Sequence, residues 1–79
     1  MQHKYTAIQG QYLAFIYYYS KIMKRAPAEA DLRAYFDVSP PTVHQMILTL
    51  ERNGFISRIS GQARSITLNL TRDQLPDLA

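Results

Sequence analysis

The sequence predicts a mostly helical α+β domain in which three helices are followed by a two-stranded β-hairpin. Residues 39–54 carry the start, the stop and the apolar stripe of one helix, and two further helical patterns precede them. After residue 54 the apolar residues change from helical spacing to alternation, which is typical of strands. The chain has 79 residues, so we expect one domain with a small core.

The first helix is expected to begin at Thr6 and to end near Lys24. Thr6 and Gln9 have the spacing of a capping box, in which each side chain binds the backbone N–H of the other residue. The face expected to point inward comprises Ile8, Tyr12, Phe15, Ile16, Tyr19, Ile22 and Met23. Leu13 and Tyr17 are off this face. Either the tyrosines of this helix cover the rim of the core with their hydroxyls in water, or Leu13 and Tyr17 form part of a contact between two copies of a homodimer.

A break at Pro27 separates this helix from the second, which is expected roughly from residue 28 to residue 36. No strong N-cap precedes the second helix, but Glu29 and Asp31 lie in its first turn, where carboxylates favour the helix dipole. Leu32 and Phe36 are expected to face the core.

The third helix has the clearest pattern. Ser39 is a good N-cap, Pro40 suits the first helical position, and Gly54 can adopt the left-handed conformation that ends a helix. The stripe expected to face the core comprises Val43, Ile47 and Leu50, with Met46 beside it. Only residues 37 and 38 link the second and third helices, so the two must cross steeply, as in a helix-turn-helix.

Two strand-like runs, residues 55–59 and 65–70, flank a loop at residues 60–64. In the second run, Ile66, Leu68 and Leu70 alternate with polar residues, which predicts a strand with one buried face. A hairpin directly after a helix-turn-helix makes a three-helix winged helix-turn-helix with a C-terminal two-stranded β-wing. We therefore assign residues 1–70 to this domain, and residues 71–79 to a tail or a linker stub.

The outer face of the third helix carries short hydrogen-bonding side chains and no acid, which suits the base edges of a DNA major groove. This face comprises Pro41, Thr42, Gln45, Leu48, Thr49 and Arg52. Arg58 and Arg64 are expected to hold phosphates. His44 flanks the face, and two interpretations stay open. DNA phosphates could favour its protonated form, or it is an ordinary neutral surface histidine.

The charge distribution agrees with a phosphate-binding surface. The net charge is +3, and Glu51 is the only acid between Val38 and Leu70, a span that holds three arginines. The alternative is an ordinary solvated basic surface.

The sequence does not favour metal binding, catalysis, secretion or insertion into a membrane. The chain has no cysteine, and His3 and His44 lack the spacing of metal ligands, so we expect no metal cofactor. No nucleophile lies at helical spacing from a base, so we expect no enzyme. The N-terminus lacks a secretory segment, and the longest apolar run has eight residues, from Tyr12 to Tyr19, too few to span a bilayer. These features favour a cytoplasmic location.

Residues 26–70 resemble the winged-helix DNA-binding domain of LexA-type repressors. The matching segments are residues 26–32, Val43-His44, residues 50–56 and, for the wing, residues 60–68. The start of the third helix is also similar to the MarR and DtxR groups, and the chain is one residue shorter than LexA just before it. The 79 residues contain no counterpart of the LexA peptidase domain, so we expect no proteolysis from them. In DtxR-type regulators, metal is bound largely by later domains.

The resemblance implies that the third helix enters the major groove while the wing touches the backbone or the minor groove. Carried over by position, it implicates Ser39, Pro41, Thr42 and Gln45 on the helix and Gln62 and Arg64 on the wing. The expected function is that of a sequence-specific regulator of transcription, a repressor by resemblance, whose partner is double-stranded DNA. The alternative is a winged helix that binds proteins. Such a module should expose large apolar residues or acids on the outer face, where only Leu48 fits.

Overall fold

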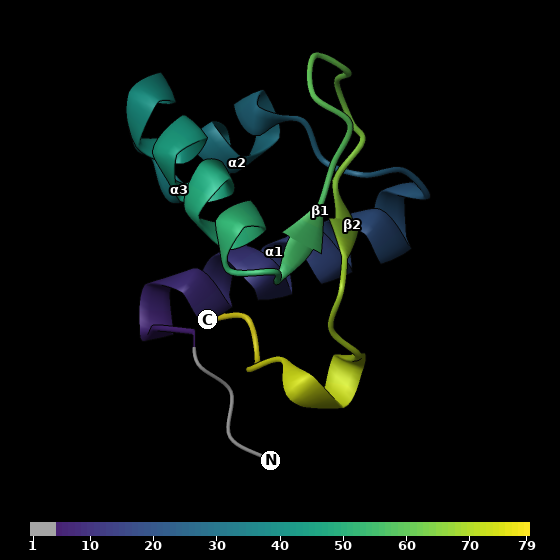
Figure 1. Cartoon of the computed structure of the whole chain (residues 1–79). Helices are drawn as coiled ribbons and strands as arrows, with labels where there is room; N and C mark the ends of the chain where they lie inside the picture. Colours follow the sequence, from purple (N-terminus) through teal and green to yellow (C-terminus); the bar gives the residue numbers. More distant parts are fainter. Residues whose placement is uncertain (1–4) are drawn as a thin grey trace.

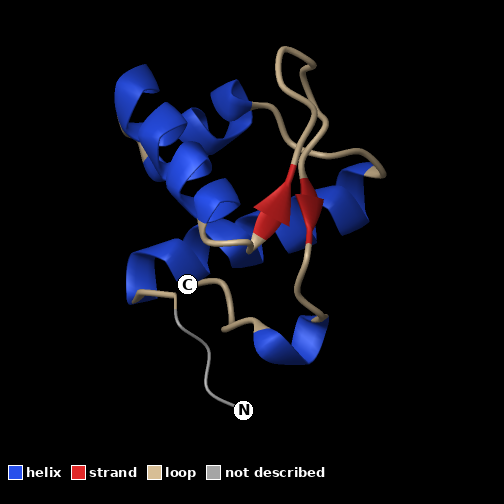
Figure 2. Ribbon diagram, viewed as in Figure 1, coloured by secondary structure: helices blue, strands red, loops and turns tan. Residues whose placement is uncertain are grey.

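The computed structural model describes residues 5–79, and its architecture confirms the predicted fold class (Figures 1 and 2). In the described residues, three α-helices precede an antiparallel two-stranded sheet and a short 3-10 turn. The elements are α1 (Ala7–Met23), α2 (Glu29–Phe36), α3 (Pro40–Arg52), β1 (Ile56–Ser57), β2 (Thr67–Leu68) and η1 (Arg72–Gln74). None of the helices in this part of the chain is long and apolar enough to cross a membrane.

Local sequence signals set the ends of α1. The N–H of Gln9 donates to Thr6 Oγ1 at 3.2 Å, and the N–H of Thr6 donates to Gln9 Oε1 at 3.0 Å, so the predicted capping box is confirmed. At the other end, Lys24 adopts a left-handed conformation with φ of 61°, and its N–H donates to the carbonyl of Ser20.

The helix-turn-helix also begins and ends as its sequence predicts. The carboxylate of Asp31 accepts the N–H of Ala28 at 2.8 Å, which compensates for the missing N-cap side chain of α2. Ser39 Oγ accepts the N–H of Thr42 at 3.3 Å at the start of α3. Beyond α3, Gly54 has a φ of 80°, a conformation that suits glycine.

The core forms where α1, α2 and α3 meet the sheet. Val43, Ile47 and Leu50 of α3 are fully buried, as is Leu32 of α2, so the predicted inward stripes are confirmed. On the α1 side, Tyr12 stacks flat on the ring of α2 residue Phe36, with ring centroids 4.1 Å apart. Phe36, Ile66, Leu68 and Leu70 are partly buried against the same cluster.

The wing is a real but short sheet. Its two strands pair Ile56 with Leu68 and Ser57 with Thr67, whereas the sequence predicted strands of five and six residues. One further backbone hydrogen bond lies next to the Ile56–Leu68 pair, where the N–H of Asn69 donates to the carbonyl of Phe55 at 2.9 Å. The wing is therefore held at its base.

The prediction of which α1 residues face the core is partly wrong. Tyr12, Phe15 and Ile16 are buried as expected, but Ile8, Ile22 and Met23 are exposed because they lie in the end turns of α1, beyond the elements that cover its middle. Leu13, which one of the two interpretations assigned to a dimer contact, is 0% exposed and belongs to the core. The expected dimer surface of Leu13 and Tyr17 therefore does not exist as a free patch.

The chain beyond residue 70, expected to be a tail or a linker stub, packs back against α1. Leu75 is 7% exposed and belongs to the core cluster. Pro76 lies so close to Gly10 that a Cβ built on this glycine would be 3.0 Å from Pro76 Cγ. Gln11 donates to the carbonyl of Asp77 and accepts the N–H of Ala79. The segment therefore covers a second side of α1, and Leu75 joins Leu13 in the core cluster.

Candidate nucleic-acid interface

The outer face of α3 presents the side chains that the sequence singled out. Pro41, Thr42 and Gln45 are exposed on its first two turns, and Ser39 Oγ lies 2.9 Å from Thr42 Oγ1 at its start. Leu48 and Thr49 follow as half-buried residues. Further along, Arg52 is exposed, and its guanidinium approaches Thr49 Oγ1 at 3.4 Å.

This face extends slightly onto α1. Gln9 lines a shallow depression together with Pro41, Thr42, Gln45 and Thr49. Sequence reasoning used Gln9 only as a capping residue, because its proximity to α3 depends on how α1 crosses beneath the helix-turn-helix. The six residues that line the depression, Met46 being the sixth, include no acid, so the surface can receive hydrogen-bonding partners or phosphates without charge repulsion.

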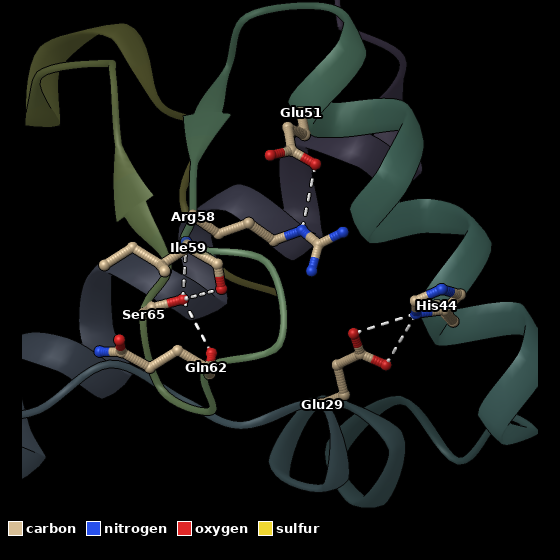
Figure 3. A network of polar contacts seen from close by, with 7 residues as sticks. All are labelled: Glu29, His44, Glu51, Arg58, Ile59, Gln62 and Ser65. Atoms are coloured by element: carbon tan, nitrogen blue, oxygen red, sulfur yellow. Dashed lines mark hydrogen bonds and ion pairs between the residues drawn. The ribbon is translucent and has the colours of Figure 1, made fainter.

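His44 is attached to α2. Its Nδ1 lies 3.2 Å and 3.3 Å from the two carboxylate oxygens of Glu29, and both side chains are about half exposed (Figure 3). His44 is therefore a surface histidine that has a partner within the domain. An exposed pair of this kind stabilises the fold only slightly, but it fixes the imidazole on the α2 side of α3.

Arg58, expected to hold phosphate, turns toward the C-terminal part of α3. Its Nε lies 3.1 Å from Glu51 Oε1, and its side chain is 17% exposed (Figure 3). The only acid of this part of the sequence is thus used to bind an arginine of the wing. This contact ties the base of the wing to α3.

Arg64, also expected to hold phosphate, folds back from the wing onto α1 and α2. Its Nη1 donates to Asp31 Oδ2 at 3.0 Å, to the hydroxyl of Tyr19 at 3.2 Å and to the carbonyl of Ala26 at 3.2 Å. Its backbone has a φ of 56°, so the chain itself turns here. Arg64 therefore connects the wing to the first two helices.

The pKa of Asp31 records this environment. Partial burial raises it, but the hydrogen bonds from Ala28, Tyr19 and Arg64, together with the charge of Arg64, outweigh burial and hold the pKa of Asp31 below its ordinary value. The same contacts raise the pKa of Arg64, first through the hydrogen bond with Tyr19. Asp31 is accordingly a charged anchor for the wing.

The wing tip is organised by Ser65. Its hydroxyl accepts the N–H of Ile59 at 2.9 Å and lies within donating distance of the carbonyls of Ile59 and Gln62 (Figure 3). Gly61 at the turn has a φ of 79°. The tip exposes Gln62 and the apolar side chain of Ile59, so within the described residues the tip itself carries no free cation.

Arg33 was not among the predicted site residues. It is exposed on α2 and lines a small depression beside Pro40 and Val43 at the start of α3. In residues 5–79 neither Arg33 nor Arg52 forms an ion pair, so both keep their charge available beside α3. The position of Arg33 could have been suspected only from the steep crossing of α2 and α3.

Comparison with known families decides the kind of domain. Residues 5–59, from the start of α1 through β1, match the family of the iron dependent repressor, N-terminal DNA binding domain. The chain belongs to this family. This iron-dependent repressor domain is therefore a DNA-binding domain of transcriptional repressors, and the expected partner, DNA, agrees with it. No curated protein matches the chain significantly. A closer relationship to LexA-type repressors stays a prediction.

The family name implies iron, but the described residues do not fit an iron site. Between residues 5 and 79, no three side chains of His, Cys, Asp or Glu lie together in a way that could hold a metal ion. The pair of His44 and Glu29 supplies only two ligand side chains, and His3 lies outside the described residues.

Proposed function

We propose that this repressor domain binds double-stranded DNA by inserting α3 into the major groove and placing the wing on the backbone or in the minor groove. The observation that carries this proposal is the outer face of α3. It is exposed, free of acids and rich in hydrogen-bonding groups, and it begins at a capped first turn. Such a face can approach both bases and phosphates.

The side chains divide into base readers and backbone holders. Gln45 and Thr42 lie on the first two turns, which enter deepest in a helix-turn-helix, and a glutamine amide can pair with adenine N6 and N7. Arg33 and Arg52, which form no ion pair in residues 5–79, are placed to hold phosphates at the two ends of α3. Gln62 is the polar side chain that the wing tip offers.

We further propose that the domain acts by binding and not by catalysis. In the described residues, the polar side chains near α3 pair as structural contacts, His44 with Glu29 and Arg58 with Glu51. Neither pair includes a nucleophile.

Selection of bound sequences from random duplex DNA tests the proposal. We expect enrichment of a site that spans one major-groove face, with protection of adjacent phosphates. The proposal would be overturned if no sequence is enriched and if the affinity for random duplex DNA is the same for the wild type, Arg33→Gln and Arg52→Gln.

A further inference from the structure

A groove with an apolar floor and a cationic rim lies at the C-terminal end of α1. Its floor is formed by Ile16 of α1 and by Ile66 and Leu68 of the wing base. Its rim carries Lys21, Lys24 and Arg25, all of which are exposed. The groove therefore combines burial for an apolar group with positive charge around it.

The charges on this rim are available. In residues 5–79, the ion pairs engage His44, Arg58, Arg64 and Arg72, and none involves a rim residue. Lys21 instead lies with its Nζ 5.9 Å from the centre of the Tyr17 ring, a wall of the same groove. Cations at the end of a helix also favour its dipole, but this effect requires no apolar groove beside them.

The groove is separate from the proposed DNA-binding face. Gln9 borders the face of α3, and Lys21 follows it twelve residues later on the same helix, which corresponds to about 18 Å along the axis. In Figure 1, α1 passes from below α3 to beyond β2, so its C-terminal end lies on the other side of the wing from α3. DNA on α3 would leave this end accessible.

We propose that this groove binds an acidic peptide segment of a partner protein that carries one apolar anchor side chain. Carboxylates would pair with Lys21, Lys24 and Arg25, while the anchor would lie against Ile66 and Leu68. A DNA duplex would satisfy the cations but offers no protruding apolar group for the floor. The exposed side chain of Ile22, which is 71% accessible, extends the apolar area beside the rim.

Fluorescence anisotropy with the complete chain tests this proposal. The probe is a labelled synthetic peptide in which acidic residues flank a single leucine. The double variant Lys21→Gln/Lys24→Asn should weaken peptide binding about three- to tenfold, because two surface ion pairs are lost. Asparagine is chosen because residue 24 has a φ of 61°, which asparagine tolerates. Binding of the selected DNA site should stay unchanged.

The matched control removes the same charge from the other side of the molecule. Arg33→Gln/Arg52→Gln should weaken DNA binding and leave peptide binding unchanged. An equal loss of peptide binding in both double variants would overturn the proposal, because it would reflect net charge alone. Equal affinity for a peptide with alanine in place of leucine, or displacement of the peptide by random duplex DNA, would overturn it as well. Far-UV circular dichroism verifies that each variant is folded.

Discussion

The helix-turn-helix and the wing use their polar side chains in opposite ways. Along α3, Thr42, Gln45 and Arg52 are exposed, and the side-chain hydrogen bonds of Thr42 and Arg52 stay within the helix and its N-cap residue. In the wing, Arg58 and Arg64 point back into the domain and bind Glu51 and Asp31. The wing arginines thus hold the wing in place beside α3. The excess of arginine in the sequence of the wing therefore does not give the wing a basic surface, because acids of the helices neutralise Arg58 and Arg64.

The helix-turn-helix and the wing also differ in how firmly their apolar side chains are packed. Leu50 of α3 is fully buried, whereas Ile59 at the wing tip is 59% exposed. Leu50→Ala should lower the free energy of unfolding by about 2–5 kcal/mol, since it leaves a cavity in a small core. Ile59→Ala should change it by less than about 0.5 kcal/mol. Urea denaturation measures both. Similar losses for the two variants would show that the wing tip is packed as firmly as α3.

The next prediction concerns specificity. Gln45 is exposed on α3, and its side chain forms no hydrogen bond within residues 5–79 that would compete with a base. Gln45→Ala should reduce discrimination at one base pair by about 1–3 kcal/mol, with preferences at the other positions retained. Binding assays on single-base variants of the selected site measure this. A uniform loss on specific and random DNA would instead assign Gln45 to backbone contact.

Arginines of the two regions should differ in the salt dependence of DNA binding. Arg52→Gln removes a free cation, so the slope of log K against log salt should decrease by about 0.9. Arg64→Gln should weaken binding by releasing the wing from Asp31, Tyr19 and Ala26, while the slope stays the same. Titrations at several salt concentrations separate the two effects. A reduced slope for Arg64→Gln would restore the original prediction that Arg64 holds phosphate.

The features that the sequence predicts correctly are the local ones. The caps at Thr6 and Ser39 and the stripe of Val43, Ile47 and Leu50 were predictable because they depend on residues within a turn or two. The outer face of α3 followed as the complement of that stripe. Pro41, Thr42, Gln45 and Arg52 of this face are exposed and Leu48 and Thr49 are half-buried, while its contacts with DNA stay a prediction.

Features set by distant residues were missed. The core cluster that contains Leu13 also includes Leu75, some sixty residues later, and Leu75 and Leu78 were weak apolar signals in the sequence. The partners of Arg64 on α1 and α2 likewise lie 33 to 45 residues away. No local pattern encodes such pairs, because they arise only when the wing folds against the helices.

The smallest expected effect is a pH dependence of stability through Asp31. Its carboxylate has a lowered pKa in the folded domain, whereas the unfolded chain should titrate near the ordinary value of about 3.9. A lowered folded pKa means that the unfolded chain takes up the proton first. The contribution of Asp31 is therefore fully present above about pH 5 and is lost as the pH falls through the folded pKa.

Asp31→Asn should be less stable than the wild type at neutral pH, and the difference should narrow as the pH falls below about 4, because the unfolded wild-type chain takes up a proton there before the folded carboxylate does. The asparagine keeps an oxygen that can accept the N–H of Ala28, so α2 should still start at the same residue. Thermal unfolding from pH 7 to pH 3 measures this. Asp37→Asn is the matched control, because Asp37 forms no ion pair within residues 5–79 and its loss should leave the acid profile unchanged. Parallel profiles of Asp31→Asn and the wild type would show that the carboxylate does not stabilise the attachment of the wing.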